Sequence, residues 1–275
     1  MFMARLLSGV VLVVIAAVTL LTGGYLLAAV CLFISMVAYG ELVKACKIRV
    51  QGQGMNALEG VGYLGIVCYY AVVVFTGSAQ AQLFAVLFTM AAFMFVYVFA
   101  FPKYRAEQVM GAFFCFAYAP VMFAFLYLTR ELPYGEYLVW MIFISSWICD
   151  TCAYLTGISI GKHKMTPKLS PKKSIEGAVG GVLGSALVGG LYGYFLVEQV
   201  VEERQVTWIF VLISAVGAVI SQVGDLAASA IKRNHEIKDY GHLIPGHGGI
   251  MDRFDSVIFT APMIYALAVL FMGRG

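Results

Sequence analysis

Charged residues are scarce in this chain. They make up 12% of its 275 residues, whereas hydrophobic residues make up 61%, and the mean hydropathy is +0.88. Soluble globular domains carry about 25% charged residues, so the composition excludes that class and indicates a protein embedded in a lipid bilayer. A spanning helix needs roughly 20 mainly apolar residues, which leaves room for about eight to ten passes and little for a separate soluble domain.

Other features are also missing. No small-residue cleavage motif clearly follows the apolar run 10–21, which predicts a retained first helix and not a signal peptide. The six cysteines lie mostly in apolar runs and indicate no disulfide framework. Cys149 and Cys152 form a C-x-x-C pair, but the further ligands of a zinc site and a thioredoxin-like context are absent.

The net charge of +3 does not imply a nucleic acid partner, because in a membrane protein the placement of Lys and Arg carries the information.

Nine apolar segments, each long enough to be a helix, are separated by charged or Gly/Pro-containing breaks. They are 7–21, 24–43, 58–75, 79–101, 108–128, 136–160, 174–197, 207–231 and 250–272. Only helices and closed barrels satisfy the backbone in lipid, so we predict an all-α, polytopic membrane bundle of about nine transmembrane helices. We expect one membrane domain, in which 1–130 is a helical scaffold and 131–275 carries the catalytic site.

The cationic residues predict the orientation. Fifteen of them fall on one side of the nine-pass topology: Arg5, Lys44, Lys47, Arg49, Lys103, Arg105, Lys162, Lys164, Lys168, Lys172, Lys173, Lys232, Arg233, Lys238 and Arg253. Only Arg130, Arg204 and Arg274 fall on the other side. Under the positive-inside rule, the first group and the N-terminus are cytoplasmic and the C-terminus is outside.

Glycine is concentrated in the seventh segment, at positions 177, 180, 181, 184, 189, 190 and 193. Small residues at such spacing let neighbouring helices approach closely, which is the interpretation we favour. A phosphate-binding glycine loop is a poor alternative, because these glycines lie within a hydrophobic span and not between a strand and a helix.

Three acidic residues lie in or beside the apolar segments, namely Asp150, Asp225 and Asp252. A carboxylate in a bilayer is costly and is by default a functional candidate. Asp225 lies about two turns before the end of the eighth segment and shares a helix face with Ser229 and Lys232.

The ninth segment begins with a second acidic face. Asp252 and Asp255 are three residues apart, and Ser256 is one turn from Asp252. Carboxylate ligands of this kind suit Mg²⁺, which binds through one or two carboxylates together with substrate phosphates. An internal ion pair of Asp225 with Lys232 or Arg253 is the alternative.

Between these two segments lies a cationic stretch, 232–249, that ends in a turn rich in Gly and His. Lys and Arg neutralise phosphate oxygens and glycines let the backbone approach them, so the stretch suits a polyphosphate, although membrane topology explains its basic residues equally well. His235, His242 and His247 match no familiar zinc spacing. We expect His247, which glycines flank, to touch the substrate.

A second cationic stretch, 161–177, leads into the seventh segment. Either Ser170 or Ser174 can cap that helix, whose N-terminus offers N–H groups to an anion. We favour phosphate binding here over the alternative, a loop that attracts anionic lipid headgroups.

Several polar positions resemble the phosphatidate cytidylyltransferase (CDP-diacylglycerol synthase) family. The resemblance lies in Ser229-x-x-Lys232-Arg233 with Lys238-Asp239, and in His247-Gly248-Gly249-x-x-Asp252-Arg253-x-Asp255. Upstream, Asp150-Thr-x-Ala-Tyr154 and Ser170-Pro171-Lys172-Lys173-Ser174-x-Glu176-Gly177 are also similar, with Ser174 where Thr is common. The N-terminal half resembles the family only in being hydrophobic.

The resemblance implies transfer of CMP from CTP to phosphatidic acid, with Mg²⁺, at the cytoplasmic face of a bacterial inner (plasma) membrane, by a homodimer. Asp225, Asp252 and Asp255 are then the metal ligands, and the catalytic set is Asp225, Asp252, Lys232, Arg233 and His247. Substrate contacts are expected from Lys172, Lys173, Ser170, Ser174, Ser229, Lys238, Gly248, Gly249, Arg253 and Asp150.

Three other functions compete with this one. A transporter would use buried acids as an ion path, but inverted halves with paired broken helices are not found. A CDP-alcohol phosphotransferase would carry D-x-x-D-G-x-x-A-R, which is absent. A lipid kinase that uses CTP is distinguished only by its product.

Overall fold

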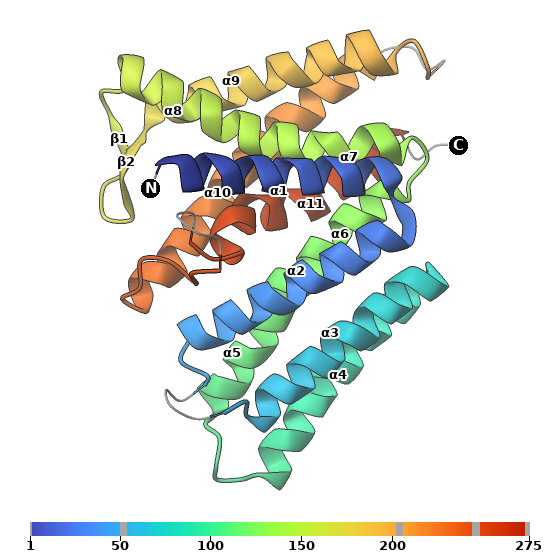
Figure 1. Ribbon diagram of the computed structural model, residues 1–275, viewed down its shortest axis with the longest axis vertical. Coiled ribbons are helices and arrows are strands. Elements are labelled where there is room, and N and C mark those ends of the chain that lie inside the picture. Colours follow the sequence, from blue (N-terminus) through green and yellow to red (C-terminus); the bar gives the residue numbers. More distant parts are fainter. Residues whose placement is uncertain (1, 50–53, 202–205, 244–247, 273–275) are drawn as a thin grey trace. The chain divides into compact units, whose positions relative to one another are not determined.

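The fold is described from a computed structural model, which covers residues 2–49, 54–201, 206–243 and 248–272 and is almost entirely helical (Figure 1). The α-helices are α1 (Phe2–Thr22), α2 (Gly24–Ala45), α3 (Ala57–Thr76), α4 (Ala79–Phe99), α5 (Ala106–Phe116), α6 (Met122–Arg130), α7 (Gly135–Phe143), α8 (Cys149–Ile160), α9 (Ile175–Tyr192), α10 (Val206–Asn234) and α11 (Met251–Met272). Three π-helical turns continue them: η1 (Ala117–Val121), η2 (Ile144–Ile148) and η3 (Gly193–Val197). One short hairpin is formed by β1 (Lys164–Thr166) and β2 (Ser170–Ser174).

Within the described residues, eight helical segments are long and apolar enough to cross a membrane, and Gly9–Thr22 is a shorter apolar helix. The prediction of an all-α integral membrane protein is therefore confirmed. Three of the eight segments are composite, because α5, η1 and α6 join into Ala106–Arg130, α7, η2 and α8 into Gly135–Ile160, and α9 and η3 into Ile175–Val197. Their bounds lie within a few residues of the predicted segments.

The surface of α4 is that of a lipid-facing helix. Only Thr89 and Phe93 of its 21 residues are buried, whereas large apolar side chains such as Phe88, Phe95 and Phe99 are exposed. An exposed apolar surface of this extent is unfavourable in water and favourable in hydrocarbon. The exposed apolar residues therefore indicate a lipid environment, although they do not test the predicted orientation.

The chain divides into two compact units. Unit 1 contains Met1–Tyr127 and Asn234–Phe254, and unit 2 contains Leu128–Arg233 and Asp255–Gly275. The roles assigned to 1–130 and 131–275, scaffold and catalytic half, stay a prediction.

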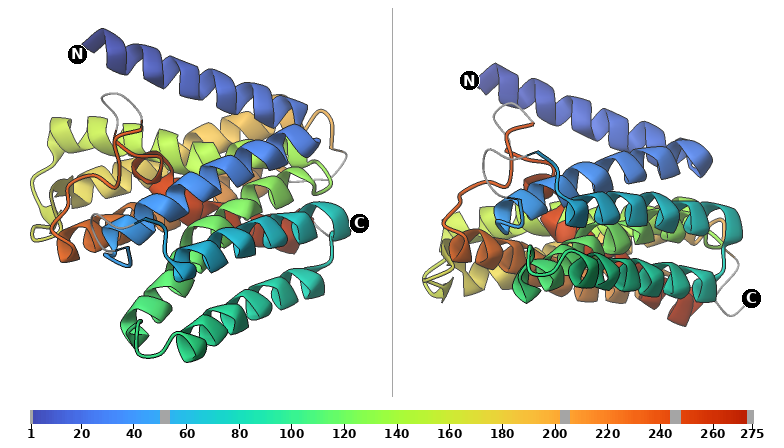
Figure 2. Two further views of the ribbon diagram at one scale, coloured as in Figure 1. Left: turned by 60° about the horizontal axis from the view of Figure 1, so that its bottom comes forward. Right: turned by 90° about the horizontal axis from the view of Figure 1, so that it is seen from below.

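Unit 1 is built around α2, α3 and α5, which pack against one another. Helices α3 and α4 lie side by side as an antiparallel pair (Figure 2). The turn between them consists of Gly77, whose φ of 60° favours glycine, and Ser78, whose side chain accepts a hydrogen bond from Ala81 N. At the other end of α3 the fully buried Glu59 pairs with Arg49, and this hydrogen bonding raises the pKa of the guanidinium above its ordinary value.

In unit 2, α8 and α9 pack along each other, and the hairpin lies beyond their ends (Figure 1). Glycines make the close approach possible. A Cβ added at Gly181 would lie 2.9 Å from both Cys149 O and Cys149 Sγ, and one added at Gly177 would lie 2.8 Å from Ala153 O. Gly193 faces Phe210 of α10 in the same manner. The interpretation of these glycines as helix-packing contacts is confirmed.

The glycine contacts lead to a stability prediction. We expect Gly181→Ala to lower the free energy of unfolding in detergent by about 1–3 kcal/mol, because the added Cβ meets backbone and sulfur atoms and overpacks the interface. The matched control is Gly60→Ala on α3, where a Cβ meets nothing within 4 Å and the helix gains up to ~1 kcal/mol. Thermal unfolding of both variants checks this, and equal midpoints would contradict it.

Candidate active site

The cationic stretch before α9 forms a β-hairpin, which the sequence analysis did not predict. Lys164 pairs with Ser174 and Thr166 with Ser170, and Leu169 N donates to Thr166 O across the turn. Strands this short and rich in Lys and Pro carry little β-propensity, so the sequence offers no signal for them. The hairpin holds Lys172 and Lys173 on an ordered strand.

Of the two candidate caps for α9, Ser174 is the one used. Its Oγ accepts a hydrogen bond of 3.1 Å from Gly177 N, whereas Ser170 lies in β2 opposite Thr166. A serine at this position satisfies one of the orphan N–H groups of the first turn.

Glu176 in the first turn of α9 binds the residues that come just before β1. Its carboxylate accepts from Lys162 N at 3.1 Å and from His163 N at 3.2 Å, and it lies 2.6 Å from Nδ1 of His163. The start of the hairpin and the start of the helix are thereby joined through one side chain.

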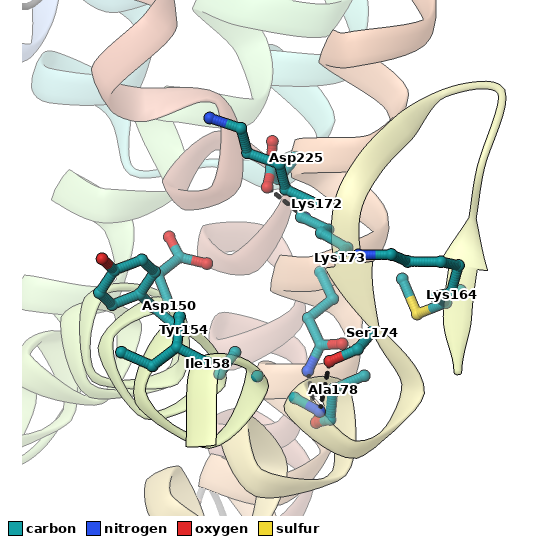
Figure 3. A pocket seen from close by; sticks show the side chains of 14 residues that line it. Asp150, Tyr154, Ile158, Lys164, Lys172, Lys173, Ser174, Ala178 and Asp225 are labelled. Carbon is teal, nitrogen blue, oxygen red and sulfur yellow. Dashed lines mark hydrogen bonds and ion pairs between the residues drawn. The ribbon is translucent and has the colours of Figure 1, made fainter. Parts of the chain in front are cut away.

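A cavity of about 500 Å³ lies in unit 2 between α8, the hairpin, α9 and α10 (Figure 3). Asp150 and Tyr154 of α8 line one side of it, and Asp225 of α10 lies across from them. The other polar residues that line it are Lys164, Lys172, Lys173, Ser174 and Gln222. The cavity therefore combines ammonium groups, hydroxyls and carboxylates, which is a suitable lining for phosphate groups and an accompanying cation.

Asp225 forms an ion pair with Lys173 inside this cavity, and Ser229 Oγ lies 3.5 Å from Asp225 Oδ1. The sequence-based alternative had named Lys232 or Arg253 as its partner. Lys173 was not considered, because it is far from Asp225 in the sequence and only the packing of α10 against the hairpin brings the two together. The Lys173 and Asp225 side chains are 27% and 26% exposed, but the ammonium nitrogen of Lys173 is itself buried, so Asp225 supplies the negative charge that compensates it.

Asp255 is the second carboxylate of unit 2 near Asp225. It is 9% exposed, and its Oδ1 accepts from Ser256 N at 2.8 Å. Gly224, the neighbour of Asp225, lets α10 approach α11 closely, since a Cβ there would lie 3.2 Å from Asp255 O. The close packing at Gly224 places Asp225 of α10 beside the turn of α11 that carries Asp255.

In unit 1, the stretch before α11 folds around Asp252. Oδ2 of Asp252 accepts hydrogen bonds from Tyr240 N at 2.8 Å and from Gly249 N at 3.0 Å. Gly248 has a φ of 83°, which favours glycine, and a Cβ there would lie 3.0 Å from the same oxygen. The predicted Gly248, Gly249 and Asp252 are thus in contact.

The remaining predicted residues are distributed as follows. Lys232 and Arg233 belong to the last turn of α10 in unit 2, where Lys232 is half-buried and Arg233 exposed. Lys238 and Arg253 are exposed in unit 1. His247 lies outside the described residues.

The sequence analysis did not name three residues that the structure places in the cavity of unit 2 or at the start of α11. Lys164 and Gln222 line the cavity, and Gln222 Nε2 donates to Ala178 O at 3.0 Å. Glu41 of α2 accepts from Met251 N at 2.8 Å, at the start of α11. Gln222 and Glu41 are each a polar residue inside an apolar run of the sequence, and this pattern could have identified both as candidates.

Within the described part of the chain, no three or more His, Cys, Asp or Glu residues are grouped so as to hold a metal ion. The donors that are present still fit Mg²⁺, because this ion commonly uses one or two carboxylates and takes its other ligands from phosphates and water. Asp225 and Asp255 supply such donors in unit 2, and Asp252 supplies one in unit 1.

Comparison with known proteins extends over almost the whole chain. A family model described as "Cytidylyltransferase family" matches residues 3–271. A protein named phosphatidate cytidylyltransferase from Staphylococcus aureus is 30% identical over 276 residues, covering 96% of this chain and 98% of that protein. The proteins of the same name from Staphylococcus epidermidis and Staphylococcus saprophyticus subsp. saprophyticus are 30% and 29% identical, with the same coverage.

Proposed function

The chain belongs to the cytidylyltransferase family, and we propose that it transfers CMP from CTP to phosphatidic acid. In this reaction a phosphate oxygen of phosphatidic acid bonds to the α-phosphorus of CTP, the bond from that phosphorus to the bridging oxygen breaks, and pyrophosphate leaves with the electron pair. The products are CDP-diacylglycerol and pyrophosphate. The names of relatives that cover the same length support the choice of substrates.

The observation that carries the proposal is the cavity of unit 2. Lys164, Lys172 and Lys173 line it together with Asp150 and Asp225, in a protein that exposes many large apolar side chains. Two phosphorylated substrates repel each other, so the first requirement of the reaction is cationic groups at fixed positions.

The nucleophile needs no strong general base. A phosphate monoester has a second pKa of about 6 and is largely ionised at neutral pH. The residues therefore act mainly by binding and orienting: Lys172 and Lys173 hold phosphate oxygens, and the N-terminal end of α9 adds its positive dipole end.

Asp225, Asp252 and Asp255 would hold Mg²⁺, which when bound offsets the negative charge on the reacting phosphates and the departing pyrophosphate. In its absence the same carboxylates would repel the substrate, and the ion pair of Asp225 with Lys173 limits that repulsion. Lys232 and Arg233, at the end of the helix that carries Asp225, are proposed to contact the leaving pyrophosphate.

We further propose that the site faces the cytoplasm of a bacterial inner membrane, with the N-terminus inside. The cationic residues of the hairpin and of the α10–α11 connection support this orientation under the positive-inside rule. Soluble CTP then meets a lipid whose acyl chains stay in the membrane. The homodimer implied by the family resemblance stays a prediction.

The test uses purified protein, phosphatidic acid, Mg²⁺ and CTP labelled at either the α- or the γ-phosphate. Cytidylyl transfer places the α-label in lipid and the γ-label in pyrophosphate. A CTP-dependent lipid kinase would place the γ-label in lipid, and this result would overturn the proposal. Parallel reactions with UTP, ATP and GTP determine the nucleotide specificity.

Two lysines of the hairpin offer a matched pair for a prediction. Lys172 lines the cavity, whereas Lys168 is exposed at the hairpin turn and does not. We expect Lys172→Ala to raise the KM for CTP about tenfold, because one charge-assisted hydrogen bond to phosphate is worth about 1.5 kcal/mol at an exposed site. Lys168→Ala should leave KM unchanged, and an unchanged KM and rate in Lys172→Ala as well would assign the hairpin charges to topology alone.

A further inference from the structure

Glu41 is a buried carboxylate in the membrane helix α2, with 8% of its surface exposed. A buried charge needs partners, and the partners of Glu41 are two backbone amides far away in the sequence. Oε1 accepts from Ile250 N at 3.1 Å, and Oε2 accepts from Met251 N at 2.8 Å. These N–H groups belong to the start of α11, where a helix leaves its first donors without intrahelical acceptors.

Two glycines pack directly against the same carboxyl group. A Cβ added at Gly249 would lie 2.5 Å from Oε2 of Glu41, and one added at Gly241 would lie 2.8 Å from its Cδ. Gly241 follows Tyr240, and Gly249 is itself a donor to Asp252, since Tyr240 N and Gly249 N donate to Asp252 Oδ2. Glu41 and Asp252 therefore contact the same two backbone segments, 240–241 and 248–251.

We propose that Glu41 is a positioning residue, which fixes the backbone around Asp252 and thereby the direction of the Asp252 carboxylate. Glu41 does not touch the substrate in this proposal. The positioning is a statement about unit 1 alone, whereas its consequence for catalysis rests on the proposed function, in which Asp252 is a metal ligand.

The chemistry of the contact requires a carboxylate. Each oxygen accepts from a different N–H group, and its negative charge lies favourably at the N-terminus of α11. Glutamine would place an NH₂ donor against one of the two N–H donors, so Glu41→Gln loses one hydrogen bond and gains a repulsive contact. Glu41→Asp keeps the charge but is one methylene shorter.

Glu59 provides a matched control. It is also a buried glutamate of unit 1 that accepts charge-assisted hydrogen bonds, with Arg49 Nε 2.8 Å from each of its carboxylate oxygens, so its ion-pair partner lies outside the stretch before α11. Glu59→Gln introduces the same mismatch of donors elsewhere in the unit. Any effect of a buried Glu→Gln change on overall stability is therefore common to both variants.

Hydrogen exchange measured by mass spectrometry on the purified full chain tests the positioning without reference to activity. We expect the amides of Ile250 and Met251 to exchange at least tenfold faster in Glu41→Gln than in the natural protein, with Glu41→Asp between them and Glu59→Gln unchanged. Unchanged exchange at these two amides in both Glu41 variants would overturn the proposal.

The consequence for catalysis is tested with the CTP assay. Residues that orient a metal ligand typically contribute 10- to 100-fold in metal affinity or activity, so we expect Glu41→Gln to lower kcat or raise the half-saturating Mg²⁺ concentration by such a factor. The KM for phosphatidic acid should not change. If the natural protein is active and Glu41→Gln resembles Glu59→Gln in kcat and Mg²⁺ dependence, the link between Glu41 and the reaction is wrong. If the natural protein forms no CDP-diacylglycerol, the proposed function fails, and the exchange rates still decide the positioning.

Discussion

Replacing Asp252 by Asn is expected to lower Mg²⁺-dependent formation of CDP-diacylglycerol by more than about 100-fold, which exceeds the usual effect of a residue that only orients a metal ligand. The substitution is informative because both backbone donors, Tyr240 N and Gly249 N, use the same oxygen, Oδ2. The amide oxygen of Asn can accept both hydrogen bonds, so the local backbone is kept while the negative charge is removed.

The contrast between Asp252→Asn and Asp252→Ala separates the proposed role of this side chain as a metal ligand from its role as the acceptor for Tyr240 N and Gly249 N. We expect both to be inactive, but only the alanine variant to speed the amide exchange of Tyr240 and Gly249. Glu107→Gln, which alters an exposed acid of the same unit, is the control and should retain full activity. Retained activity in an expressed Asp252→Asn protein would remove Asp252 from the metal site.

Replacing Asp225 by Asn is expected to lower activity by a similar factor, with a much smaller effect on stability. The Asp225 and Lys173 side chains are each about one quarter exposed, but the ammonium nitrogen of Lys173 is buried. The amide oxygen of Asn can still accept a hydrogen bond from this nitrogen, while the compensating negative charge is lost, so the free energy of unfolding should fall by about 1–3 kcal/mol. A loss of activity well beyond this loss of stability indicates a role in the reaction and not in the fold.

A double variant separates the two parts of this prediction. Lys173→Met with Asp225→Asn removes both charges, so its stability should return toward that of the natural protein while its activity stays low. Glu136→Gln, at an exposed acid that pairs with the half-buried Arg130, serves as the control in the same unit. If the double variant regains activity, Asp225 acts only as the partner of Lys173 and is not a metal ligand.

Part of the cavity lining was named from the sequence, because acids in apolar segments and a run of cationic residues between two such segments are conspicuous. Asp150, Lys172, Lys173, Ser174 and Asp225 were named from sequence, and the structure gathers all five around one cavity. The hairpin that carries the lysines was missed, since it consists of residues with little preference for strands. Glu41 was missed although it is a polar residue inside an apolar run, because its partners are backbone amides at the start of α11 and the sequence does not show that they lie beside it.

The sequence by itself determined the class of the protein and the positions of its helices. In lipid every backbone N–H and C=O must be satisfied within the segment, so the length of each apolar run is sufficient to place a helix. Only the tertiary structure decided which charges meet. Lys173 lies 52 positions before Asp225, and Glu41 lies 210 positions before Met251. Such pairs depend on how helices pack, and packing is set by the shapes of many side chains together and not by any local pattern.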